Sequence, residues 1–324
     1  MITRKDIAAH LEKNIRTGYL LGSKEYSPRR SPFCRDVPSD GAFEEYTDMG
    51  AAPWPVQNAG KIGSGGTDGR ISAPVNGQMN AGQQVMVIGG EERALVVYNV
   101  DWEIVIGVTH NAIDDDRAGD LENWARTAAI NFEKFKDYKA FEALNTGAAT
   151  TTIGPCYDGL SLFNDAHIDP NAEYQTSQDN LYALALSYTN YNTVRVAGAG
   201  FLDSRGRAVG LNHNLLIYPP ALRDAAAQII KNPQKPGQTN LDINAFAGDT
   251  TGLEAPGGWL DATAWFVVDA SMPVKPINLQ VRKNAELVIW DDENTGDGGV
   301  RYFKWHARGN IFPGDWRLIL QGNT

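Results

Sequence analysis

The chain has 324 residues, of which 42% are hydrophobic and 21% charged, and this composition is typical of a globular protein rather than a disordered one. Its formal net charge of −10 argues against non-specific attachment to nucleic acid, because neutralising phosphates requires an excess of Lys and Arg. No apolar run approaches the roughly 20 residues that span a bilayer, and no signal peptide is apparent, so we expect a soluble protein made in a cytoplasm.

The first segment of the chain is basic. Residues 1–35 contain eight Lys and Arg and three acidic residues, which gives this segment a charge of +5 and the remainder −15. Apolar residues that recur every four positions predict a short amphipathic helix over 3–16. Residues 22–41 are rich in Pro, Ser, Arg and Gly, which indicates an extended arm. Such a segment either binds an acidic partner, which can be another copy of the chain, or is a solvated terminus.

The next segment is rich in glycine. Three prolines and eight glycines within 50–82 exclude a helix there. A long stretch of this kind is unusual inside a compact domain, so we expect an extended loop that packs on another molecule. It is followed by β-branched and aromatic residues over 84–88 and 93–108, which predict a long hairpin or ribbon.

A long helix is predicted over 114–146. Apolar residues step by three or four along it, and Gly147 follows its end. About 30 residues rising 1.5 Å each give a length of roughly 45 Å, which is enough for a spine beneath a sheet. We interpret the acidic residues Asp114, Asp115 and Asp116 as its first turn, where they complement the helix dipole.

The rest of the chain mixes both kinds of element and contains no internal repeat. Helices are predicted over 180–188 and over 221–230, where a proline stands at the entry. The pattern therefore indicates an α+β protein. Strands are predicted over 215–218, 264–269, 277–281, 286–290, 300–307 and 316–320.

Few residue patterns suggest chemistry. His110 with Asp114 and Asp116 could bind a metal in a hydrolase, but acids that cap a helix explain the same pattern better. Cys34 and Cys156 have no metal-ligand spacing, and two free thiols are the simplest interpretation. The glycine-rich stretches lack a complete phosphate or dinucleotide pattern, and no nucleophile motif occurs. We therefore expect no enzyme, no cofactor and no metal site.

Several stretches, taken in order, resemble the major head subunit family of Mu-like phages. The first begins with LVVYNVDWE at 95–103 and continues to IDDDRAG at 113–119. The second is YDGLSLFNDAH at 157–167, and the third runs from WFVVD at 265–269 to Trp316. The resemblance covers roughly residues 90–324. The chain departs from the family pattern in its Gly-rich stretch and in His110, which stands where Arg is expected.

This resemblance implies the Hong Kong 97-type capsid fold. In such a fold a projecting loop (the E-loop), a peripheral P-domain with a spine helix and an axial A-domain follow an N-terminal arm. The implied boundaries are 1–40 for the arm, 41–95 for the E-loop and its flanking ribbon, 96–149 and 275–324 for a discontinuous P-domain with its spine helix at about 114–146, and 150–274 for the A-domain.

The resemblance also implies a function, which is structural. We expect a major capsid protein that self-assembles into hexamers and pentamers of an icosahedral phage head around double-stranded DNA. An encapsulin-like nanocompartment shell around an enzyme cargo is the alternative. Expected assembly contacts are Arg4, Lys5, Arg29, Arg30, Trp54, Arg70, Glu91, Glu92 and Arg93.

The implied partners follow from that function. They are other copies of the chain, a portal, a decoration protein where one exists, and packaged DNA bound without sequence specificity, with no membrane involved. We expect a separate scaffold protein, because the chain carries no large helical, charged leader. The expected location is the virion, after synthesis in the host bacterial cytoplasm.

Overall fold

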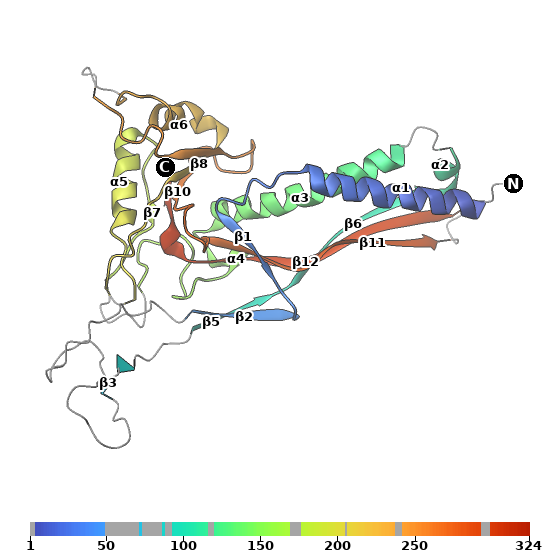
Figure 1. Ribbon diagram of the computed structural model, residues 1–324, viewed down its shortest axis with the longest axis horizontal. Helices are drawn as coiled ribbons and strands as arrows, with labels where there is room; N and C mark the ends of the chain where they lie inside the picture. The colour runs from blue at the N-terminus through green and yellow to red at the C-terminus, as the bar shows by residue number, and fades with distance from the viewer. Residues whose placement is uncertain are drawn as a thin grey trace.

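The computed structural model describes residues 4–48, 71–72, 86–87, 93–115, 120–168, 176–204, 206–236, 242–292 and 299–324. Figure 1 shows an elongated limb, in which two helices lie along a sheet, and a second body with its own sheet at one end of the limb. We call these two parts the limb and the second body. Together they form the α+β fold that the sequence predicts.

The limb is built on a four-stranded sheet. Its strands are β1 (Cys34–Pro38), β11 (Ile277–Asp292), β12 (Val300–Pro313) and β6 (Val100–Thr109), in that order across the sheet. β1 runs parallel to β11, and the other neighbours are antiparallel. Alternate residues of β12 point to opposite faces, so Phe303 and Trp305 are buried on one face while Lys304 lies on the other.

Two helices cover that buried face. α3 (Asp120–Thr146) has 27 residues, which corresponds to about 40 Å, and its Ala125 and Phe132 pack with Phe303 and Trp305 of the sheet. α1 (Arg4–Glu25) lies beside α3. The two helices approach closely because α1 has glycine at position 22, where a Cβ atom would overlap a backbone oxygen of α3.

The second body has a five-stranded sheet whose buried strands are almost entirely apolar. Trp265 and Phe266 of β10 (Trp265–Val268) are completely buried at its centre. Its core continues into the limb, where Phe33 and Phe141 belong to the same cluster. The strand order is β7 (Leu181–Tyr182), β13 (Ile319–Gly322), β10, β8 (Leu215–Tyr218) and β9 (Thr251–Glu254).

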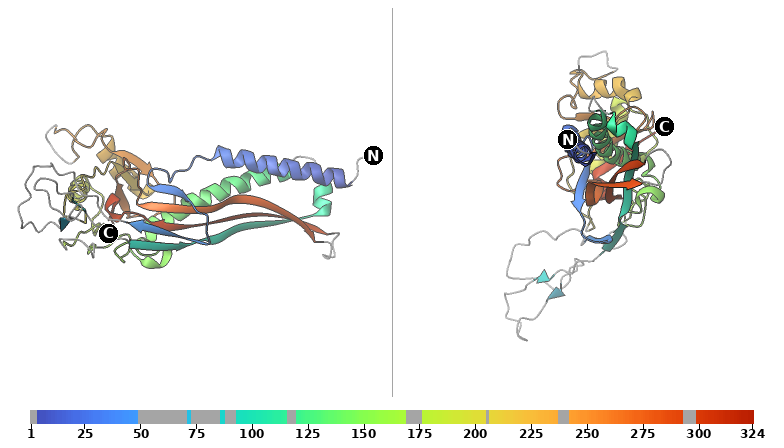
Figure 2. Two further views of the ribbon diagram at one scale, coloured as in Figure 1. Left: turned by 60° about the horizontal axis from the view of Figure 1, so that its bottom comes forward. Right: turned by 90° about the vertical axis from the view of Figure 1, so that its right-hand side faces the viewer.

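Shorter elements connect these parts. β2 (Phe43–Asp48) and β5 (Arg93–Tyr98) form an antiparallel hairpin on the side of the limb away from the helices (Figures 1 and 2). β3 (Ile71–Ser72) pairs with β4 (Met86–Val87). The remaining elements are α2 (His110–Asp114), α4 (Thr150–Ile153), α5 (Tyr188–Ala199), η1 (Pro220–Leu222), α6 (Arg223–Ile230) and η2 (Trp316–Leu318).

Several predicted boundaries are wrong. The first helix extends to Glu25, so the arm expected from residue 22 begins later; packing against α3 stabilises the additional turns. The long helix begins at Asp120 and not at Asp114, which ends α2. Its first turn therefore contains Asp120 and Glu122 as acidic residues.

The helix predicted over 180–188 is also wrong. Asn180 is completely buried, and its side chain donates to the carbonyl oxygens of Leu162, Trp316 and Ile319, which fixes an extended segment. The helix in this region, α5, begins only at Tyr188, after its N-cap residue.

Other differences are smaller. The strands predicted at 277–281 and 286–290 form one strand with an irregularity between them. The strand predicted over 316–320 begins with the 3-10 helix η2. The helix predicted over 221–230 is confirmed as η1 and α6 with proline at the entry. Most of the Gly-rich segment 50–82 lies outside the described residues.

Candidate assembly surfaces

The chain leading from α1 to β1 is fixed to α3 by a buried ion pair. Asp137 of α3 is 0% exposed and accepts hydrogen bonds from the Tyr26 hydroxyl (2.7 Å), the Arg29 backbone N–H (2.7 Å) and the Arg30 guanidinium (2.8 Å). Arg30 is 3% exposed and also donates to Asp36 at 2.7 Å. We call these side chains, with the backbone of Arg29, the Asp137 cluster.

The cluster is electrostatically complete. Burial alone would lower the pKa of Arg30, but its hydrogen bonds to Asp36 and Asp137 raise the pKa above its ordinary value. Three hydrogen bonds and the opposite charge of Arg30 offset the cost of burying the Asp137 carboxylate, whereas burying either charge alone would be strongly unfavourable. The cluster therefore fixes the connection between α1 and β1 against α3.

A second network fixes the base of the β2–β5 hairpin. Tyr46 stacks on Phe312 of β12 with ring centroids 4.5 Å apart, and its hydroxyl donates to the side chain of Gln280 at 3.0 Å. Gln280 in turn donates to Asn99 at 2.8 Å, and Asn99 donates to Ser39 at 3.0 Å. Burial raises the pKa of Tyr46 to about 12, so its hydroxyl remains a donor at neutral pH.

Asn99 also explains why the predicted ribbon is interrupted. The sequence predicts one continuous β segment over 93–108, but the structure divides it into β5 and β6 at this residue. β5 pairs with β2, whereas β6 joins the four-stranded sheet. The hairpin is therefore rigid at its base and projects from the face of the sheet opposite to the helices.

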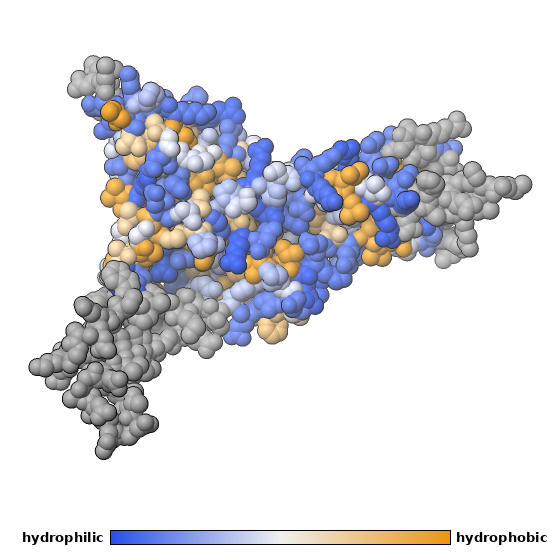
Figure 3. Space-filling model, viewed as in Figure 1, coloured by the Kyte–Doolittle hydropathy of each residue, from blue (hydrophilic) through white to orange (hydrophobic). Residues whose placement is uncertain are grey.

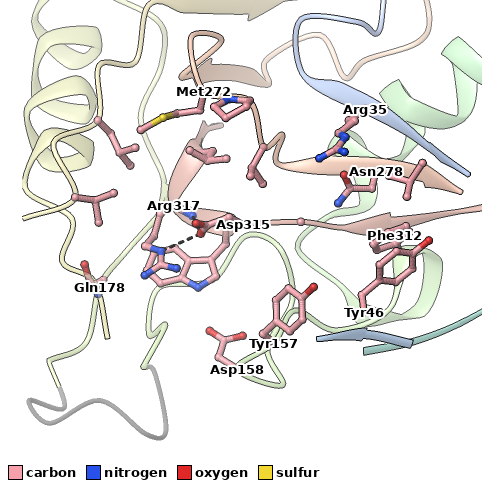
Figure 4. A pocket seen from close by; sticks show the side chains of 18 residues that line it. Arg35, Tyr46, Tyr157, Asp158, Gln178, Met272, Asn278, Phe312, Asp315 and Arg317 are labelled. Carbon is pink, nitrogen blue, oxygen red and sulfur yellow. Dashed lines mark hydrogen bonds and ion pairs between the residues drawn. The ribbon is translucent and has the colours of Figure 1, made fainter. Parts of the chain in front are cut away.

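A cleft of about 620 Å³ lies where the limb, the hairpin and the second body meet (Figure 4). Arg35 and Asn278 occupy paired positions of β1 and β11 and form one wall. Tyr46 and Phe312 form another wall, and Asp315 lies across from both walls, bonded to Arg317 at 2.9 Å. Several of the lining side chains thus bind or stack on other residues of the same chain.

A buried pair beside this cleft resembles catalytic chemistry only superficially. His167 Nδ1 lies 2.5 Å from the carboxylate of Asp158, and the imidazole stacks on Trp316 at 4.1 Å with an interplanar angle of 3°. Both side chains are almost completely buried. An imidazole sealed against Trp316 cannot meet a substrate, so this pair contributes to packing.

The described residues contain no arrangement for metal chemistry. None of their His, Cys, Asp and Glu side chains form a group of three that could hold a metal ion. Of the hydrolase set, His110 begins α2 and Asp114 ends it, while Asp116 lies outside the described residues. Burial raises the pKa of the Cys34 and Cys156 thiols, which keeps both protonated and poorly nucleophilic.

The predicted assembly contacts are placed as follows. Arg4 and Lys5 begin α1, and Arg93 begins β5, in positions whose side chains are outside the described set. Arg29 is exposed, whereas the guanidinium of Arg30 is used within its own chain. The residues that lie outside the described ranges are Trp54, Arg70, Glu91 and Glu92.

Sequence reasoning missed a different set of surface residues, which are large and apolar. Such side chains are exposed on α1, on the hairpin and on the uncovered face of the four-stranded sheet, and Figure 3 shows apolar groups on both the limb and the second body. Apolar surface of this kind marks interaction sites when it is contiguous. The members on these three surfaces are Leu20, Leu21, Phe43, Val96, Tyr98, Val105, Val288 and Trp290, and the limb also exposes Val100, Trp124 and Tyr138.

None of the described helices is both long enough and apolar enough to cross a bilayer. Some of the exposed apolar groups adjoin one another, such as Phe43 and Tyr98, whose ring centroids are 5.6 Å apart, and Leu20 and Leu21, which follow each other in α1.

Comparison with known proteins gives matches of two kinds. Residues 84–185 match the model of the family described as Mu-like prophage major head subunit gpT. The fold is similar to the procapsid of bacteriophage JBD30, with a TM-score of 0.52 and 16% identity over 98% of this chain and 75% of that chain. A comparison with curated proteins gives no match.

Two further structures show the same fold. The structure from Mycobacterium phage Patience has a TM-score of 0.53 and 10% identity, and the alignment covers 98% of this chain and 85% of that one. The capsid of an empty GTA particle has a TM-score of 0.51 and 12% identity, with 92% of this chain and 90% of that chain covered.

These findings define the class of protein first. The fold is that of phage capsid proteins. The family match then gives the role: the chain is a structural major capsid protein, and its resemblance to the Mu-like major head subunit is confirmed over 84–185. The nanocompartment alternative is not favoured by this match.

Proposed function

We propose that the chain self-assembles into the hexamers and pentamers of an icosahedral phage head that encloses double-stranded DNA. The observation that carries this proposal is a rigid hairpin that projects from an elongated limb and leaves large apolar side chains exposed. Apolar side chains on a projecting element gain stability only when a neighbouring subunit covers them. Many such modest contacts make a shell stable.

The parts of the chain then have distinct roles. We assign residues 96–149 and 275–324 to the P-domain, with α3 as the spine helix, and residues 150–274 to the A-domain. Residues 1–40 form the N-terminal arm and 41–95 the E-loop with its flanking ribbon. β13 belongs to the P-domain range, and it pairs with β7 and β10, which belong to the A-domain range. The end of the chain therefore connects the two domains.

We further propose the partners of the shell. They are a separate scaffold protein, a portal, and packaged double-stranded DNA, which the shell encloses without sequence specificity. One similar structure is the capsid of bacteriophage JBD30 decorated with minor capsid protein trimers, with a TM-score of 0.51 and 15% identity over 73% of this chain and 92% of that chain. A decoration protein is accordingly a candidate partner here. The mature protein resides in the virion and is made in the host bacterial cytoplasm.

The experiment is expression of the chain with and without its scaffold, followed by size-exclusion chromatography and negative-stain electron microscopy. We expect capsomers or closed shells in at least one of these preparations. A strictly monomeric species in every condition, with scaffold present, would contradict the proposal.

A further inference from the structure

One charged side chain of the cleft in Figure 4 has no partner among the described residues. The lining contains two arginines and two aspartates. Asp315 bonds Arg317 at 2.9 Å, so these two charges compensate each other. The Asp158 carboxylate is 3% exposed and lies 2.5 Å from the His167 imidazole. Arg35 is exposed, and its guanidinium forms no hydrogen bond or ion pair with any residue that the structure describes. The cleft therefore contains one positive charge without a counter-ion.

An amide donor lies beside this charge. Arg35 and Asn278 are paired in register on the parallel strands β1 and β11, and both side chains lie on the same wall of the cleft (Figure 4). The amide of Asn278 has no hydrogen-bond partner within the described part of the chain either. Gly314 leaves space beside it, because a Cβ atom there would lie 2.9 Å from the amide nitrogen. Two neighbouring donors without acceptors suit a carboxylate, whose two oxygens can accept from both.

Another part of the lining is apolar. Val209, Leu211 and Met272 of the second body contribute to it; Leu211 is buried, and the other two are partly buried against the core. Pockets for small molecules have volumes of roughly 300–1,000 Å³, mostly apolar walls and a few polar groups that fix the orientation of the ligand. The cleft, with about 620 Å³ and its two donors, has these properties.

We propose that the cleft binds a small amphipathic carboxylate, in which a single carboxylate is joined to an apolar chain. The carboxylate accepts hydrogen bonds from the Arg35 guanidinium and the Asn278 amide. The apolar chain packs on Val209, Leu211 and Met272. A ligand with one negative charge matches the one uncompensated positive charge, whereas a phosphate dianion would bring a second negative charge into the cleft without a partner.

Such a ligand contacts two parts of the fold at once. Arg35 and Asn278 belong to the sheet of the limb, whereas Met272 belongs to the second body. A ligand that binds only the folded chain stabilises it by mass action, so the bound carboxylate raises the thermal midpoint of the chain. The inference does not depend on the proposed shell function, because the cleft lies within one chain and its ligand can be measured on the dispersed subunit.

Isothermal titration calorimetry of the dispersed full chain with sodium decanoate tests the site. We expect saturable binding of one decanoate per chain. Decanamide has the same apolar chain without the charge, so it should bind at least about tenfold more weakly. Arg35→Met removes the charge but keeps an unbranched side chain, and it should weaken decanoate binding about tenfold or more while decanamide binding stays within about twofold of wild type.

Two further variants sharpen the comparison. Arg29→Met is the matched control, because Arg29 is an exposed arginine of the same segment that does not line the cleft, and it should leave decanoate binding unchanged. Arg35→Glu reverses the charge, so this variant should prefer decylammonium to decanoate. Circular dichroism of each variant checks that it is folded.

Nuclear magnetic resonance locates the ligand. Met272 lines the cleft, so a chain labelled with ¹³C at the methionine methyl groups carries a probe there. The Met272 resonance, assigned with Met272→Leu, should move with added decanoate and reach a plateau at the stoichiometry that calorimetry gives.

Four results would overturn the inference. They are an absence of saturable decanoate binding to the wild-type chain, an Arg35→Met variant that binds decanoate as tightly as wild type, and a Met272 resonance that does not move at saturation. The fourth is binding of a short peptide that ends in a leucine with a free carboxylate, when decanoate does not bind. That result would assign the cleft to the carboxyl end of a protein partner.

Discussion

The substitution Asp137→Ala removes the acceptor at the centre of the Asp137 cluster. It leaves the guanidinium of Arg30, which is 3% exposed, without its buried counter-ion, and it leaves the Tyr26 hydroxyl and the Arg29 N–H without an acceptor. Removing one partner of a buried ion pair costs about 3–5 kcal/mol, because the remaining charge is then buried and uncompensated. Since folded domains are stable by about 5–15 kcal/mol, this loss is a large fraction of the total.

The assay is urea unfolding of the dispersed subunit, followed by circular dichroism and tryptophan fluorescence. With an m value of about 3 kcal/mol/M, the predicted loss lowers the unfolding midpoint by about 1–2 M. Asp36→Ala is the matched control, because it removes the other carboxylate that binds Arg30. The side chain of Asp36 is about half exposed, so its loss should cost less than about 1 kcal/mol.

A double variant separates the loss of the charge pair from the loss of packing. Arg30→Met combined with Asp137→Leu replaces both charges with apolar groups of similar volume, which is often neutral or stabilising for buried pairs. We expect it to recover most of the stability that Asp137→Ala loses, less the hydrogen bonds of Tyr26 and Arg29. If Asp137→Ala costs no more than Asp36→Ala, the reasoning about the cluster is refuted.

Three further predictions concern other parts of the fold. Burial lowers the pKa of His213, so as the pH decreases below about 6.5 the unfolded chain takes up a proton before the folded chain does. The free energy of unfolding therefore decreases as the pH decreases, until the folded imidazole is protonated as well. His213→Gln should flatten the dependence of the free energy of unfolding on pH between about pH 5 and 7, and an unchanged slope would contradict this. Gly22→Leu should separate α1 from α3 and expose α1 to limited proteolysis, because a Cβ there overlaps the Arg126 carbonyl; an unchanged cleavage pattern would show that the helices tolerate it. Phe141→Ala should lower the free energy of unfolding by about 3–5 kcal/mol, since the ring is completely buried against Phe33, and a cost below about 1 kcal/mol in urea unfolding would argue against that core.

Local patterns predicted the elements that depend on local periodicity. The apolar steps along α3 gave a long helix, and the dense β-branched residues around Val105 gave a strand. The start of α3 was misplaced because three consecutive acids resemble a first turn, whereas Asp114 ends the short helix α2. A dipole argument cannot distinguish two helices that follow each other within a few residues.

Contacts between distant residues decided the rest of the fold. Arg30 and Asp137 are 107 positions apart, so no local pattern could show that the basic segment is fixed to α3. In the same way, the burial of Asn180 among carbonyl groups overrode a helical pattern. The identity of the shell protein came from the resemblance of ordered stretches and not from any single element.

The expected assembly contacts remain a prediction. Charge indicated that the first segment would find an acidic partner, but it selected Arg30, whose guanidinium is bound within the chain. The exposed apolar members, such as Leu20 and Tyr98, were missed because a sequence does not reveal which side of an amphipathic element remains uncovered. That information depends on which face of the sheet receives α1 and which receives the hairpin.

The most direct test of the central claim is a three-dimensional reconstruction by electron microscopy of particles formed by the expressed chain with its scaffold. The structural role predicts closed shells built from pentamers and hexamers, with one copy of the limb and second body in each subunit position. A preparation that contains only monomers, or particles whose subunits do not accommodate this fold, would contradict the claim.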